Sequence, residues 1–258
     1  TQTIEAAGAM TDTLRKMLEA ASTSTEIEDI YAPFKAKRRT RGAVAREKGL
    51  EPLAKQIMAG RIADVSSAAS RFSGKNGVEN TDEAIDGAAD IIAEWAADSI
   101  RLRNMTRNAY RRNASITATA AKGADLASTP FAQYGDFSQS IRRISSHQYL
   151  ALRRAEREGL IKIKYELGDE AERLSDALVK AYTPATATTE CADIIADAVE
   201  DAAKRLLRPS VENEISASLK EEADRVAIDI FSDNLRQLLL AAPLKGLRII
   251  ALDPGYRT

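Results

Sequence analysis

The sequence predicts a mainly α-helical protein, and three of its features support that fold class. Alanine, which costs the least free energy to place in a helix, is the commonest of the 258 residues. Helix-breaking residues are few, with 13 glycines and 7 prolines, and aromatic residues make up only 5%. Apolar side chains recur every three or four positions over most of the chain. A multi-helix scaffold with very few strands is therefore expected.

Four short helices are expected in the N-terminal part of the chain. In the first, Leu14, Met17 and Leu18 lie on one face. Pro52 takes the favoured first-turn position of the fourth helix, and Gly60 ends it. A stretch rich in Ser, Gly and Asn follows and is typical of a connection. The expected helices are 11–19, 26–31, 41–47 and 53–59, and the connection is 66–81.

The segment that begins at Asp82 predicts one long helix. Apolar or small residues recur at helical spacing from Ile85 to Leu102, and no proline interrupts the chain before Ala121. The sequence therefore allows a single helix of up to about 39 residues, roughly 58 Å long. Its first turns are acidic and its later turns basic, an arrangement that the helix dipole favours. Gly123 then breaks the pattern.

Further helices and two strands are expected in the rest of the chain. The helices are 137–144, 147–158 with Ser146 as N-cap, 171–182, and two long ones on either side of Pro209. Residues 160–167 read LIKIKYEL and alternate apolar with polar, which predicts a strand. Residues 247–252 read LRIIAL and predict a buried terminal strand. Because this strand has no partner and the chain begins with Thr, we interpret the chain as a fragment and expect the strand to fray or swap.

Residue counts and missing motifs exclude several classes of site. His147 is the only histidine and Cys191 the only cysteine, which excludes a His-rich zinc site and an intrachain disulfide. We expect His147 to make local hydrogen bonds at a helix start and Cys191 to be a small core residue. The sequence contains no phosphate loop, dinucleotide glycine fingerprint or serine elbow. No catalytic residue, metal or cofactor is therefore expected.

The sequence also indicates a compartment. No run approaches the roughly 20 consecutive apolar residues that a membrane span needs, and no signal peptide is visible. A single cysteine agrees with a reducing environment, in which structural disulfides are rare. A cytoplasmic protein that does not enter a membrane is therefore expected.

The formal net charge is only −1, but the charges are segregated along the chain. Residues 34–48 hold seven cations and one acid, and residues 79–98 hold seven acids and no Lys or Arg. Residues 99–112 then hold five arginines and no acid. Such blocks create strong local fields even when the total charge cancels, so they are the first places to look for a charged partner.

Two groups of cations are candidate nucleic-acid-binding residues. The basic block consists of Lys35, Lys37, Arg38, Arg39 and Arg41, which follow a proline and are expected to begin as exposed loop. The arginine stripe consists of Arg103, Arg107 and Arg111, spaced four apart on one helix face. Both could contact phosphates without reading bases. The alternatives are solvated side chains, or ion pairs that join helices, including pairs with the acidic face of 79–98.

Three stretches resemble a known family. Residues 28–54, EDIYAPFKAKRRTRGAVAREKGLEPLA, are similar to the signature of the Tex family of bacterial transcription accessory proteins, in which Y-x-P-[YF]-K-x-K-R-R-T-[RK] precedes A-R-E-x-G-L-E-P-L-A. Residues 146–159 resemble the family's S-H-R-x-L-A…E-G segment, with Gln148 for the usual Arg and Ala155 where Gly is common. Residues 253–258, DPGYRT, resemble the first strand and turn of its YqgF-type RNase H-like domain.

The resemblance implies a cytoplasmic, multidomain protein that binds nucleic acid, RNA or DNA, mainly through an OB-type domain absent from this chain. It implies an N-terminal helical part at 1–65, with helix-turn-helix character and the basic block. A helical scaffold would follow at 66–245, and 246–258 would be the start of a truncated YqgF/RNase H-like domain. Asp253 would be the first acidic position of that domain.

Three functions are compatible with these features. The favoured one is a non-enzymatic helical scaffold that supports nucleic-acid binding in transcription, with the basic block adding sequence-independent affinity. The alternative is a protein-interaction module that docks RNA polymerase or the protein's own downstream domains, which a sizeable exposed apolar patch would favour. A nuclease built around Asp253 is the least favoured, because two-metal nucleases need several converging carboxylates.

Overall fold

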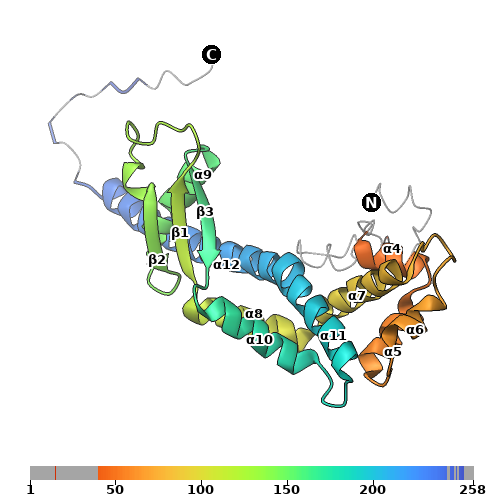
Figure 1. Ribbon diagram of the computed structural model, residues 1–258. Helices are drawn as coiled ribbons and strands as arrows, with labels where there is room; N and C mark the ends of the chain where they lie inside the picture. The colour runs from red at the N-terminus through yellow and green to blue at the C-terminus, as the bar shows by residue number, and fades with distance from the viewer. Residues whose placement is uncertain (1–14, 16–39, 243–244, 247, 249, 253–258) are drawn as a thin grey trace. The chain divides into compact units, whose positions relative to one another are not determined.

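The computed structural model describes residues 15, 40–242, 245–246, 248 and 250–252 (Figure 1). Helices dominate these residues, so the predicted mainly α fold class is confirmed. Two compact units make up the chain: the first joins the residues up to Glu94 with Pro184–Ile195, and the second joins Trp95–Thr183 with the residues from Ala196 onward. The first two predicted helices, Asp253 and all of the basic block except Arg41 lie outside the described residues.

The first unit is built from short helices around a small apolar core. Its helices are α4 (Arg41–Glu47), α5 (Glu51–Ala59), α6 (Val65–Ser70), most of α7 (Thr81–Asp98) and the start of α11 (Thr189–Ala202). Pro52 lies in the first turn of α5, and Gly60 ends the helix in the left-handed conformation at φ 68°, both as predicted. Leu53 and Ile57 of α5 are fully buried, as is Cys191 of α11.

The second unit packs further helices against a small sheet. Its helices are α8 (Ile100–Asn113), α9 (Ser146–Arg157), α10 (Glu170–Tyr182) and α12 (Arg208–Leu239), and a π-helical turn (Ala203–Leu207) joins α11 to α12. The predicted helices 147–158 and 171–182 are thereby confirmed, although Ser145 rather than Ser146 is the N-cap of α9. The Ser145 N–H donates to Gln148 Oε1 at 3.2 Å, which completes a capping box.

The single helix allowed between Asp82 and Ala121 is not formed. α7 ends at Asp98, and Ser99 adopts an extended conformation in which its Oγ accepts the N–H of Leu102 at 3.5 Å. A serine that caps the next helix satisfies backbone groups that would otherwise need the helix to continue. The long helix of the fold is instead α12, with 32 residues.

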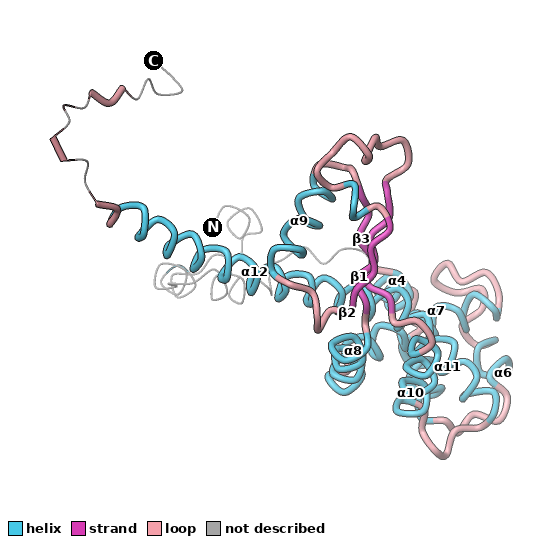
Figure 2. The backbone as a smooth tube through the Cα atoms, turned by 90° about the vertical axis from the view of Figure 1, so that its left-hand side faces the viewer, coloured by secondary structure: helices cyan, strands magenta, loops and turns pink. Residues whose placement is uncertain are grey.

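A three-stranded antiparallel sheet forms part of the second unit. β3 (Ile161–Glu166) confirms the predicted strand, and its neighbours are β1 (Ser115–Ala120) and β2 (Asp136–Ser140) in the order β2-β1-β3. The predictions of helix for the segment that is β1 and for 137–144 are wrong. β1, drawn in magenta in Figure 2, reads SITATA. Ile116 and Ala118 are buried while their neighbours Ser115, Thr117 and Thr119 are less so, and this period of two fits a pleated strand better than a helix.

The predicted terminal strand is also not formed in the described residues of 247–252. Arg248 and Ile250–Leu252 lie in no strand, and Ile250 and Leu252 are each 89% exposed. A strand requires a neighbour to satisfy its backbone groups, and no described strand pairs with this segment. Over the part of the chain that the structure describes, no helix is both long and apolar enough to cross a bilayer.

Candidate nucleic-acid interface

Arg41 is the one member of the basic block that the structure describes. It is the first residue of α4 and is exposed. Thr40 precedes it as the N-cap, and its Oγ1 accepts the N–H of Ala43 at 3.1 Å. The start of α4 therefore presents a cation to solvent from a fixed backbone position.

Two neighbouring cations form ion pairs with the acidic face of α7. Arg46 Nη1 lies 2.7 Å from Glu94 Oε2, and Lys48 Nζ contacts Glu83 Oε1. Both cations belong to the charged segment 34–48, and both acids belong to the segment 79–98. For these two residues, the alternative in which basic and acidic segments pair within the chain is therefore confirmed.

Glu94 also binds the first turn of α4, and this contact explains the glycine there. The N–H of Gly42 donates to Glu94 Oε1 at 3.1 Å, and a Cβ at Gly42 would lie 2.4 Å from Glu94 Cδ, inside contact distance. Burial by itself raises the pKa of the Glu94 carboxyl, but hydrogen bonds from Thr40 and Arg46, the Arg46 charge and the Gly42 N–H outweigh burial, so its pKa is lowered.

The arginine stripe of α8 faces α12 in part. The guanidinium of Arg107 donates to both oxygens of Glu214 on α12, at 2.6 and 2.8 Å. Arg111 Nη2 lies 3.8 Å from the same carboxylate, while Arg103 Nη2 donates to the Ala97 carbonyl at 3.2 Å. The hydrogen bond from Arg107, followed by the charges of the stripe, lowers the pKa of Glu214. Two arginines of the stripe thus join α8 to α12 through the carboxylate of Glu214.

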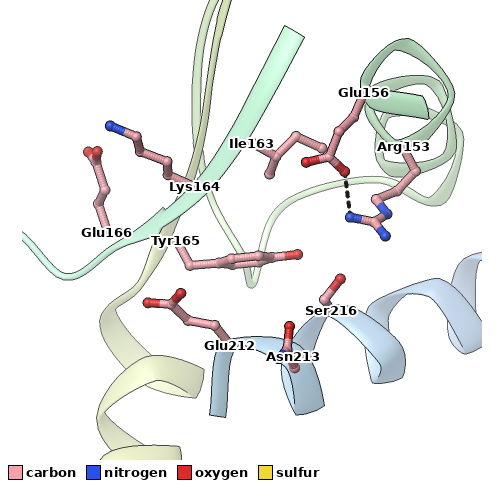
Figure 3. Close-up of a pocket in the computed structure, with 9 residues that line it drawn as sticks. All are labelled: Arg153, Glu156, Ile163, Lys164, Tyr165, Glu166, Glu212, Asn213 and Ser216. Carbon is pink, nitrogen blue, oxygen red and sulfur yellow. Dashed lines mark hydrogen bonds and ion pairs between the residues drawn. The ribbon is translucent and has the colours of Figure 1, made fainter. Parts of the chain in front are cut away.

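A polar pocket of about 360 Å³ lies elsewhere in the second unit, among β3, α9 and α12 (Figure 3). Within its wall, Tyr165 Oη lies 3.1 Å from Tyr149 Oη, which donates to the Ser216 carbonyl at 2.9 Å. Burial raises the pKa of the Tyr165 hydroxyl. The lining residues are Arg153, Glu156, Ile163, Lys164, Tyr165, Glu166, Glu212, Asn213 and Ser216.

Among the described residues, no three His, Cys, Asp or Glu side chains are placed to hold a metal ion. His147 is exposed, and its Nε2 lies 3.4 Å from Ser145 Oγ, the local contact expected for a histidine at a helix start.

Comparison with known proteins identifies the family. Residues 62–231 match the family model described as "Tex central region-like". The chain belongs to the Tex family. It is 35% identical over 99% of its length to "Transcriptional accessory protein Tex" of Neisseria gonorrhoeae, and 31% identical over its full length to "Protein tex" of Bordetella pertussis. It is also 28% identical over 99% of its length to "S1 RNA-binding domain-containing protein 1" of Homo sapiens.

The chain spans about a third of the two bacterial Tex relatives, 34% of each, and about a quarter of the human protein, 27%. The matched Tex central region includes the arginine stripe, Glu214 and the polar pocket. The family model begins after the basic block, which the alignments with the two bacterial Tex relatives cover.

Sequence reasoning did not single out Glu94, Glu214 or the pocket residues. The acidic segment contained Glu94, but nothing in its spacing marks that residue as the partner of Arg46. Glu214 lies on a different helix, far along the chain from the Arg107 that it binds. Such pairs depend on how helices pack, and periodicity within one helix carries no information about them.

Proposed function

We propose that this Tex-family chain is a non-enzymatic helical scaffold of a cytoplasmic transcription accessory protein, and that it supports nucleic-acid binding. The observation that carries the proposal is the match of most of the chain to the Tex central region. Relatives that align with nearly the whole chain have names that refer to transcription and to an S1 RNA-binding domain. The scaffold would hold a helix-turn-helix part and the YqgF/RNase H-like domain in place for the nucleic acid.

Within this function, the basic block supplies sequence-independent affinity for phosphates. Two of the seven acids of 79–98 that could neutralise it are bound elsewhere, since Glu94 binds Gly42 and Arg46, and Glu83 binds Lys48. Arg41 remains exposed at the start of α4. The arginine stripe contributes less, because its central member Arg107 is held by Glu214.

The experiment is a fluorescence-anisotropy titration of the purified chain with a single-stranded RNA and a DNA duplex at several salt concentrations. If three or four phosphates are engaged, log affinity falls with log salt at a slope of about −2 to −4. The Arg38→Ala/Arg39→Ala variant should weaken binding and flatten the slope by about 1 to 2. A matched variant, Lys122→Ala/Lys180→Ala, removes two exposed cations elsewhere and should change neither. A flat salt dependence, or unchanged binding by the first variant, would contradict the proposal.

A second candidate is a protein-interaction module that docks RNA polymerase or the protein's own downstream domains. The observation that favours it is the C-terminal end of α12, where Ile228, Phe231, Leu235 and Leu238 recur at helical spacing and are 65%, 67%, 41% and 72% exposed. An exposed apolar stripe of this size is typical of a protein contact.

A further inference from the structure

One edge of the sheet is open. β1 lies between β2 and β3, so among the described strands the far edge of β3 has no neighbour. The N–H of Ala121 donates to the Leu160 carbonyl at 2.9 Å, which fixes the alternation of the ladder. Lys162 and Lys164 therefore direct their backbone groups toward β1. The N–H and carbonyl groups that point to the open edge belong to Ile161, Ile163 and Tyr165.

The polar pocket runs along this open edge. Four consecutive residues, Ile163 to Glu166, form one of its walls, while α9 and α12 form the others. Figure 3 shows that Ile163 and Tyr165 project toward α9 and α12, and that Lys164 and Glu166 project the opposite way. A strand added at the edge would alternate in the same manner. Every second side chain would enter the pocket, and the others would lie beside the lysines.

Hydrogen bonds fix the wall of the pocket before any ligand arrives. Tyr149 Oη is within 3.1 Å of both Tyr165 Oη and Ser216 Oγ, which ties β3 and α9 to α12. Glu212 accepts the Tyr110 hydroxyl at 2.7 Å. A site whose side chains are already held loses little conformational entropy on binding.

The charges on the two faces of β3 indicate what kind of strand would fit. Lys162 and Lys164 are exposed on one face and have no ion pair among the described salt bridges. On the pocket face, Arg153 is bound to Glu156 at 2.6 Å, and Glu212 is an acid that no described salt bridge neutralises. The first face favours acidic side chains, and the pocket favours a basic one between them.

Two other occupants fit less well. A second copy of the chain, paired edge to edge, would bring its own lysines against Lys162 and Lys164, the arrangement that protects natural edges from pairing. A nucleic acid would gain little from this surface, because two lysines can neutralise only about two phosphates. The unpaired N–H and carbonyl groups of the β3 edge are best satisfied by the backbone of an extended peptide.

We propose that the open edge of β3 binds an extended peptide of a partner protein by strand addition. The peptide carries acidic side chains opposite Lys162 and Lys164, and a basic side chain opposite Ile163 that enters the pocket. Backbone hydrogen bonds to Ile163 and Tyr165 provide affinity, and the alternating charges provide register. Ile161 points to the same edge but is only 2% exposed, so it is not counted among the binding positions. This site is independent of the basic block and of the function proposed for it.

Amide hydrogen exchange followed by NMR tests the backbone contacts directly. The probe is a short synthetic peptide of sequence Thr-Val-Glu-Arg-Glu-Val-Thr. In the free chain the amides of Ile163 and Tyr165 should exchange fast, and saturating peptide should slow them by about tenfold. The amides of Lys162 and Lys164, already bonded to β1, should be protected in both states. The same peptide with N-methyl groups at alternate amides cannot pair and should give no protection.

Charge reversal tests the register. In Lys162→Glu/Lys164→Glu, both substitutions are at exposed positions, and the affinity for the Glu-Arg-Glu peptide should fall by about tenfold. A peptide with Lys-Arg-Lys in its place should then recover the loss, and the Lys180→Glu control on α10 should bind like the parent. Equal affinity for the N-methylated peptide, or no peptide binding at all, would overturn the proposal. So would an RNA that binds at this edge and displaces the peptide.

Discussion

At the scale of single residues, Glu94 is the carboxylate on which the first unit depends most clearly. It accepts hydrogen bonds from Gly42 and Arg46, and its side chain is 15% exposed. The pKa of Glu94 is lowered from its ordinary value of 4.5, so the carboxylate contributes its full stabilisation of the fold at pH values above 4.5. The contribution is lost as the pH falls below about 4.5 and the folded carboxylate takes up its proton.

We therefore predict that Glu94→Gln lowers the free energy of unfolding by about 1 kcal/mol at pH 7. The difference between variant and parent should shrink toward zero as the pH falls below 4.5, since the parent loses the same charge there. Urea unfolding at several pH values, followed by the fluorescence of Trp95, measures this. The matched control is Glu51→Gln, which removes a carboxylate from an exposed pair with Lys55 and should cost less. A pH-independent difference would show that charge is not the cause.

At the scale of elements, the ion pair between α8 and α12 gives the next prediction. Arg107 and Glu214 are paired through two hydrogen bonds while 26% and 38% exposed, so water screens the pair only in part. In a double-mutant cycle of Arg107→Gln and Glu214→Gln, we expect a favourable coupling energy in the free energy of unfolding, so that the two substitutions together cost less than the sum of each alone. Arg225 and Glu222, neighbours on one exposed helix turn, provide the control cycle and should couple less.

The same cycle separates the two interpretations of the arginine stripe. If Arg107 serves mainly to join helices, Arg107→Gln destabilises the chain and leaves the salt slope of nucleic-acid binding unchanged. A slope that falls by about 1, with no loss of stability, would instead assign Arg107 to the phosphate-binding surface.

Individual helices and strands also show which parts of the fold could be predicted from the sequence. β3 alternates strictly, and α5 carries both a first-turn proline and a terminal glycine, so local signals define each of them. β1 and the break at Ser99 were missed because alanine and serine suit several conformations and the deciding contacts are tertiary. The polar pocket joins β3 to α9 and to a distant part of α12, so the sequence predicts only its β3 wall.

At the scale of the whole molecule, the C-terminal end of α12 is the largest exposed apolar feature of the described chain. Besides the stripe of Ile228, Phe231, Leu235 and Leu238, Ile230, Leu239 and Leu240 are also more than half exposed. A stripe at this spacing is the pattern of a helix that packs against another element.

We predict that this end of α12 makes the isolated chain associate with itself as its concentration rises. Contact with another copy of the chain would remove this exposed apolar surface from water, which lowers the free energy. Sedimentation velocity over a range of concentrations should show the association, and Phe231→Ser/Leu238→Ser should abolish it without loss of helical circular dichroism. Ile100→Ser is the control, because Ile100 is 77% exposed but stands alone at the start of α8. Identical sedimentation of parent and double variant would show that the stripe binds nothing by itself and would weaken the protein-interaction function.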